Sequence, residues 1–126
     1  MSLSDTFETH VLNYLFTATS VTRPTAWYLG LYTSAPTDSA AGTELSGSGY
    51  ARQTVAFTVS GNLATNTSAV EFPTATGSWG TIVAVAILDA SSSGNILAYA
   101  SLSANKTIAT GDVLRIPAGD LDLTLD

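Results

Sequence analysis

From residue 26 onward, the chain is a succession of short runs rich in Val, Ile, Leu, Thr and Tyr, separated by turn-forming residues. Many of the runs are about five to eight residues long, which is typical of β-strands. In several runs apolar side chains alternate with others, as Trp27, Leu29 and Leu31 do with tyrosine and glycine between them. The pattern predicts a mainly β fold, an antiparallel β-sandwich of jelly-roll type with about seven or eight strands.

The strands are expected where these runs lie. They cover residues 27–32, 52–59, 63–72, 81–89, 96–102, 107–109, 113–116 and 121–125. The run at 81–89 does not alternate, which indicates a strand buried on both faces or covered by a helix. Residues 90–95 form the turn of a predicted hairpin. The longest gap, 34–49, is rich in small residues, and we expect this loop to make contacts.

One segment has the periodicity of a helix. Apolar side chains recur every four residues from Leu3 to Leu15, and Asp5 and Glu8 suit the positive end of a helix. We expect an amphipathic helix over about residues 5–16, capped by Ser4 or Asp5. Its apolar stripe should lie flat on the sheet of its own subunit or of a neighbour. No linker divides the chain, so residues 1–126 are expected to form a single domain.

The charge pattern limits the partners. Charged residues make up 11% of the chain, against roughly 25% in an ordinary domain, which favours a surface that other subunits cover. The net charge is −6 and the four basic residues are scattered, so nucleic-acid binding is not expected. No apolar run is long enough to span a membrane, and we expect synthesis in a cytoplasm. The chain has no cysteine.

The sequence predicts neither a catalytic site nor a cofactor. His10 is the only histidine, and we expect it at the border of the helix stripe. Glu44, Glu71 and Asp89 are expected to be solvated rather than catalytic. Asp120, Asp122 and Asp126 could supply oxygen ligands to calcium, but the sequence provides no loop that would wrap around the ion. We therefore predict no metal and leave calcium at Asp120 and Asp122 open.

The glycines at 47 and 49 are interpreted as turn residues that precede a strand containing Arg52. An arginine just inside a strand commonly forms an ion pair, and Glu44 or Asp38 in the preceding loop could be its partner. The pair would lie within the subunit or between subunits. The candidate interface residues are Tyr28, Tyr32, Tyr50, Arg52 and Trp79.

Several sequence words occur together in one order. They are SLSD at 2–5, YLGLYTSAPTD at 28–38, GSGYARQ at 47–53, WGT at 79–81, AILDA at 86–90 and GNILAY at 94–99. In this order the words resemble a family of small tailed-bacteriophage virion proteins, described as tail fibre or minor tail proteins. The resemblance covers nearly the whole chain. It implies a particle component assembled in the host cytoplasm, and it brings no enzymatic residues with it.

We therefore expect a structural virion protein, a tail- or baseplate-associated fibre or adaptor that contacts other virion proteins and self-associates, with a trimer favoured. A capsid decoration protein is one alternative. Another is a carbohydrate-binding module, with a sugar-stacking platform made of aromatic residues, namely Trp27, Tyr28, Tyr32, Trp79 and Tyr99. We do not expect an enzyme.

Overall fold

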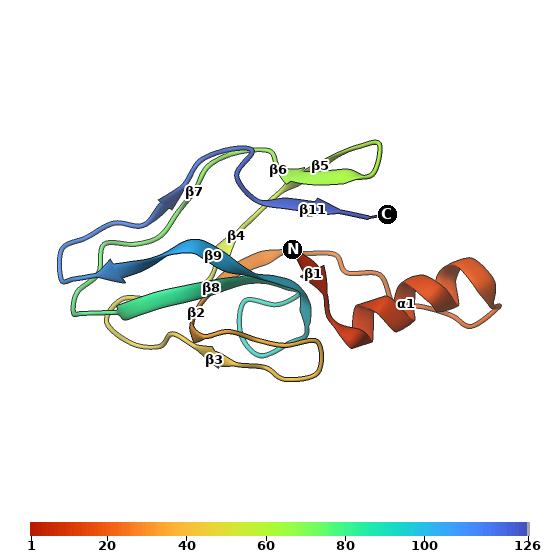
Figure 1. Cartoon of the computed structure of the whole chain (residues 1–126), viewed down its shortest axis with the longest axis horizontal. Helices are drawn as coiled ribbons and strands as arrows, with labels where there is room; N and C mark the ends of the chain where they lie inside the picture. Colours follow the sequence, from red (N-terminus) through yellow and green to blue (C-terminus); the bar gives the residue numbers. More distant parts are fainter. Residues whose placement is uncertain (126) are drawn as a thin grey trace.

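The structure is a computed structural model that describes residues 1–125. It is mainly β, all strand pairs are antiparallel, and the only helix among the described residues lies near the N-terminus. The mainly β, antiparallel, sandwich-like prediction is therefore confirmed. Figure 1 shows the largest sheet on one side, the small sheets on the other, and helix α1 projecting from one end.

The largest sheet has the order β1-β9-β8-β2-β3, and β4 pairs with the same edge of β2 as β3. Its strands are β1 (Ser2–Leu3), β2 (Tyr28–Ser34), β3 (Thr43–Glu44), β4 (Gln53–Thr54), β8 (Gly80–Leu88) and β9 (Ile96–Ile108). The hairpin of β8 and β9 lies where the sequence predicts it, and β9 continues beyond the predicted strand. A bulge between Ile82 and Ala84 shifts the register of this hairpin.

Two small sheets form the second layer. One has the order β11-β6-β5 and the other pairs β10 with β7. The strands are β5 (Phe57–Ser60), β6 (Leu63–Asn66), β7 (Val70–Glu71), β10 (Arg115–Ile116) and β11 (Asp122–Thr124). The predicted strands 52–59 and 63–72 are each broken in two. In the first of them, the N–H of Val55 still donates to the carbonyl of Trp27, next to the large sheet. After Val55 the chain crosses to the second layer, where it forms β5.

The main core lies between the two layers. Leu29 and Leu31 of β2 and Ile87 of β8 contribute from the large sheet, while Phe72 and Leu121 contribute from the segments opposite. Phe72 and Trp79 are the largest fully buried side chains. Burial of so much apolar surface is the main force that holds the layers together.

The opposite face of the large sheet is also buried. Tyr32, Ala84, Ala86 and Leu88 form a second, smaller cluster there. Strand β8 is therefore buried on both faces, which confirms one of the two predicted alternatives. At Gly30 on this face, a Cβ would lie 3.1 Å from Oε2 of Glu44, so the end of the long loop packs directly against the sheet.

Helix α1 (Asp5–Phe16) has the predicted bounds, but it does not lie flat on the sheet of its own subunit, which was one of the two predicted alternatives. Phe7 is its only buried residue, and the helix extends away from the body (Figure 1). The predicted side-chain cap is also absent at Ser4, because the Ser4 hydroxyl donates to the Ile96 carbonyl at 2.6 Å. Together with the pairing of β1 to β9, this bond fixes only the root of the helix.

Replacement of Trp79 by alanine should lower the free energy of unfolding by about 3–5 kcal/mol. The change leaves a cavity in the main core and removes the hydrogen bond from Nε1 to the Ser48 carbonyl. Urea denaturation would measure the loss. Val59→Ala is the control, because Val59 is exposed, and its effect should stay within about 0.5 kcal/mol. Equal effects of the two substitutions would contradict this description of the core.

Candidate functional site

Three polar side chains form a connected group at the edge of β2, which we call the Arg52 network: Glu44, Tyr50 and Arg52. Arg52 donates from Nε to Oε2 of Glu44 at 2.8 Å and from Nη2 to Oε1 at 2.7 Å. This two-pronged geometry is the strongest form of an Arg–carboxylate pair. It is the one ion pair in the described part of the chain, residues 1–125. Of the two predicted partners, Glu44 is the correct one.

Arg52 also fixes a distant loop. Its Nη1 donates to the carbonyls of Ala90 at 2.8 Å and Ser93 at 2.7 Å, which belong to the turn between β8 and β9. Asp89 shapes the same turn, because its carboxylate accepts from the N–H of Asn95 at 2.7 Å. Arg52 therefore joins the long loop to the β8–β9 turn, and the sequence prediction did not include this second contact.

Tyr50 completes the hydrogen bonding of strand β2. Its hydroxyl accepts from the Leu31 N–H at 3.0 Å and donates to Oε2 of Glu44 at 2.7 Å. Leu31 lies between the β2 residues that pair with β4 and those that pair with β3. The Tyr50 hydroxyl therefore accepts the hydrogen bond that the carbonyl of a neighbouring strand would otherwise accept from the Leu31 N–H. The ring packs against Phe72 and edge-on to Trp79.

The network shifts the titration of its members. Burial acts to raise the pKa of Glu44, but hydrogen bonds from Arg52 and Tyr50 outweigh burial and hold that pKa below its usual value. The pKa of Tyr50 is raised by burial and by its hydrogen bond to Glu44. Burial and the Glu44 carboxylate raise the pKa of nearby Tyr32 to about 12. At neutral pH Glu44 is therefore ionised, and both tyrosines keep their protons.

This arrangement suits a structural task. Both carboxylate oxygens of Glu44 and three nitrogens of Arg52 are already occupied by partners within the chain. The hydrogen bonds from Arg52 and Tyr50 stabilise the ionised form of Glu44 and lower its pKa, which makes this carboxylate a weak general base. The network holds two loops against the edge of the sheet and gives that end of the molecule a fixed shape.

The five candidate interface residues have different positions. Tyr50 and Arg52 belong to the network, and Tyr28 is half-buried at the start of β2. Tyr32 and Trp79 are each 2% exposed, so they have almost no surface left for a neighbouring subunit. These two also belong to different clusters, on opposite faces of the large sheet. They cannot form one sugar-stacking platform in this conformation.

Asp38 takes part in a separate contact. Its side chain accepts from the Tyr99 hydroxyl, and its carbonyl accepts from the Asp5 N–H at 3.0 Å. The long loop is therefore attached at one end to the helix root and to β9, and at the other end to Arg52. No sequence pattern indicated the pair of Asp38 and Tyr99.

The other candidates for chemistry are scattered. His10 packs edge-on against Phe7, and its Nδ1 is buried without a partner. Within residues 1–125, no three acidic or histidine side chains are grouped to hold a metal ion. Asp120 directly follows a turn, Asp122 lies in β11, and Asp126 is outside the described residues.

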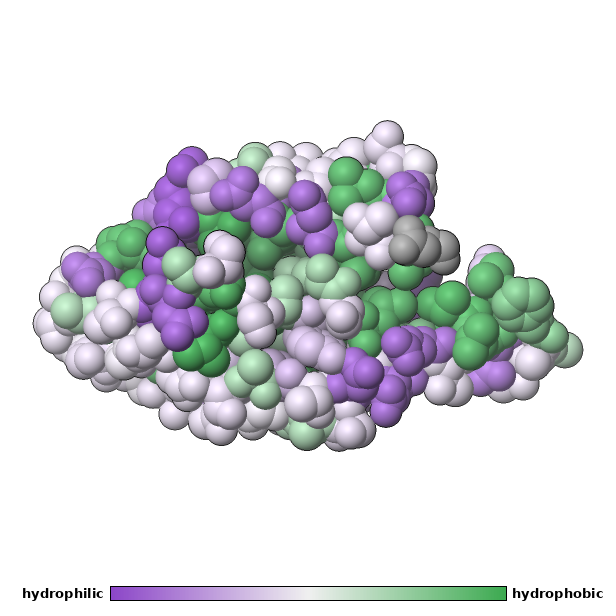
Figure 2. Space-filling view, in the orientation of Figure 1, coloured by the Kyte–Doolittle hydropathy of each residue, from purple (hydrophilic) through white to green (hydrophobic). Residues whose placement is uncertain are grey.

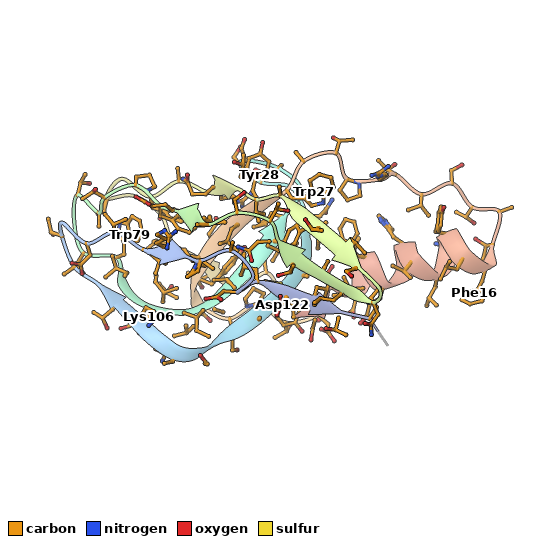
Figure 3. All side chains as sticks on the ribbon, turned by 90° about the horizontal axis from the view of Figure 1, so that it is seen from above. Phe16, Trp27, Tyr28, Trp79, Lys106 and Asp122 are labelled. Atoms are coloured by element: carbon orange, nitrogen blue, oxygen red, sulfur yellow. The ribbon has the colours of Figure 1, made fainter. Side chains whose placement is uncertain are left out.

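A second surface lies where helix α1 meets the body. An apolar cleft of about 390 Å³ is lined by side chains from the helix and from both layers, including Phe7, Val11, Trp27, Phe57 and Leu123. Figure 2 shows that the hydrophobic surface continues from this junction onto the projecting helix. Figure 3 shows Phe16 at the far end of the helix, away from the body.

Sequence reasoning missed the cleft because its walls come from segments far apart in the chain. It also treated the helix stripe as narrow, although Leu12 and Phe16 lie outside the four-residue repeat. Those two side chains were the sequence signal that the apolar face of the helix is wider than one stripe. None of the helical structure described for residues 1–125 is long and apolar enough to span a membrane.

The described residues form a mainly β body from which a helix with exposed apolar side chains projects. Comparison with protein families identifies the class as phage fibre proteins. The family model for podophage GP4 fiber I protein gp80 matches residues 2–124, and the chain belongs to this family. It is thus a phage fibre-type virion protein and not a member of a known enzyme family. A comparison with curated proteins found no match.

Arg52→Ala should destabilise the chain by about 2 kcal/mol, because charge-assisted hydrogen bonds are lost and a half-buried carboxylate remains without its partner. Arg52→Lys should restore little, since one ammonium group cannot reproduce the contacts to Glu44, Ala90 and Ser93. Urea denaturation measures both. Arg115→Ala is the matched control, because Arg115 is exposed on β10. Full rescue by lysine would contradict the role of the network.

Stability should also depend on pH through Glu44. Its pKa is lower in the folded chain than in the unfolded chain, so its contribution is present at neutral pH and is lost as pH falls through the folded pKa. The difference in unfolding free energy between the wild type and Glu44→Gln should therefore shrink between about pH 5 and pH 3. Denaturation at a series of pH values tests this. A difference that stays constant would show that Glu44 gains nothing from its charge.

Proposed function

We propose that this chain is a tail- or baseplate-associated fibre or adaptor protein, which acts as a single unit and attaches to other virion proteins through subunit contacts. Family membership supports the fibre class. The observation that supports an attachment role is the projecting helix, whose distal apolar residues remain exposed. A contact surface of this kind has a physical need for a partner.

The body is suited to hold such a surface in place. Its two layers share one core, and the Arg52 network fixes the loops at the edge of the large sheet. A rigid body that fixes the root of the helix reduces the entropy that is lost when the helix binds a partner. We propose that the body is a fixed support and that the helix and the adjoining cleft make the contacts.

The proposed partners are proteins. The net charge of −6 disfavours nucleic acid, whose phosphates carry the same sign. We propose assembly in the host cytoplasm and self-association, with a trimer favoured. Tyr28 and the partly exposed members of the Arg52 network remain proposed secondary contacts.

Fractionation of the particle tests the location. When purified particles are disrupted into heads and tails, the chain should be found with the tails, as detected by mass spectrometry of each fraction. Recovery with the heads would overturn the proposal and support capsid decoration instead. A second control uses a glycan array with the purified chain, where specific retention would support the carbohydrate-binding alternative.

A further inference from the structure

The distal part of helix α1 is apolar over more than half of its circumference. Successive helical residues are about 100° apart, so Tyr14 and Phe16 mark the edges of an arc about 200° wide. Val11, Leu15 and Leu12 lie between these edges. A helix that packs on one surface needs only about half of that width. The arc is wide enough for contact with two neighbours.

These side chains are exposed in the isolated chain. Tyr14 and Phe16 are 76% and 77% exposed, Leu12 and Leu15 are 57% and 61% exposed, and Val11 is 37% exposed. We call this set the arm face. The return segment that follows the helix lies beside part of it, and a shallow apolar groove lies between them, but the outer side chains remain open.

The exposed area approaches what a specific interface requires. Aromatic side chains can bury about 150–250 Å² each, and with the aliphatic residues the arm face offers about 450 Å² per chain. Complete burial of the arm faces of two copies would remove at most about 900 Å² from water, close to the ~1,000 Å² of a specific interface. The cleft is continuous with the arm face through Phe7 and Val11, and its exposed rim residue Val59 adds further apolar area.

The low intrinsic stability of a short helix also indicates that a partner covers the arm face. A helix of 12 residues is at the lower limit of what is stable in water, and packing of an apolar face supplies most of its stability. Only Phe7 is buried within the chain. A partner that covers the arm face would supply the missing packing for the distal turns.

The charges indicate what kind of partner fits. The helix has acidic residues in its first turn and no basic residue in its last turn, so it has no attraction for an anionic lipid surface. From residue 9 to residue 16 it has no Asp, Glu, Lys or Arg. Two copies of the arm can therefore approach each other without charge repulsion, although the chains are acidic.

We infer that the arm face is a self-association surface, on which the arms of two or three copies of this chain pack against one another. The 200° arc favours three copies, because each arm can then contact two others. This inference rests on the proposed function and specifies which residues make the contact between subunits. It requires no other virion protein.

The test compares the full chain with two triple variants by light scattering over a range of concentrations. The arm variant is Leu12→Gln, Leu15→Gln and Phe16→Gln. The matched control is Thr6→Gln, Thr9→Gln and Asn13→Gln, which places the same residue outside the arm face. We expect a discrete dimer or trimer for the wild type and the control, and a single chain for the arm variant.

Circular dichroism and urea denaturation verify that each variant keeps its fold, which is expected because the substituted side chains lie outside the core. Phe16→Gln alone gives a second measurement at the last residue of the helix. It should raise the dissociation constant about tenfold or more. Association of the wild type should persist at high salt, because the face is apolar.

A wild-type chain that stays monomeric at every concentration would overturn the inference. So would an arm variant that associates as well as the control, or a chain that binds a different virion protein while remaining monomeric. These results are separable from the particle fractionation. A chain that self-associates through the arm face but is recovered with the heads would leave this inference standing while the tail location fails.

Discussion

The ion pair of Arg52 with Glu44 connects parts of the chain that are far apart in the sequence. Through it, the long loop is attached to the edge of the large sheet and to the turn between β8 and β9. Tyr50 extends the connection to the backbone of β2 and to the aromatic core. If the pair were lost, the loop, the edge strand and the turn would lose a common support. The fixed shape of this end of the molecule depends on that one interaction.

Helix α1, in contrast, is only weakly attached to the rest of the chain. Its root is held by β1, by the Ser4 hydroxyl and by Phe7, whereas its distal turns have little support within the chain. A chain that buries its core efficiently and still exposes several large apolar side chains on one helix has a surface that requires a partner. In a fibre protein the partner lies in the particle. We therefore propose that the body provides a fixed shape and that the helix provides the contact surface.

Much of this could be predicted from the sequence, where the signal is local. The helix bounds follow from periodicity, and the burial of β8 follows from its unbroken apolar run. Proximity in the chain indicates an ion pair of Arg52 with Glu44 or Asp38, and the structure selects Glu44. The breaks near Val55 and after Asn66 could not be predicted, because the alternation of side chains continues while the strand changes its partner. The contact of Arg52 with Ala90 and Ser93 joins residues about 40 positions apart, and no local pattern indicates it. For the same reason the sequence predicts an interface role for Trp79, although the structure buries its side chain in the main core. A pattern shows which residues are apolar, and only the tertiary structure decides what covers them.

Hydrogen exchange provides the most direct test of the central claim. According to this claim, the body is stabilised by its own core, whereas the distal turns of the helix are packed only after assembly. Exchange of backbone amides would be compared between the dilute isolated chain and the same chain in intact particles. The amides of residues 9–16 should be protected in the particle and exchange rapidly in the isolated chain, while those of β2 and β8 should be protected in both. Equal exchange at residues 9–16 in the two samples would mean that assembly leaves the helix uncovered, and would contradict the account.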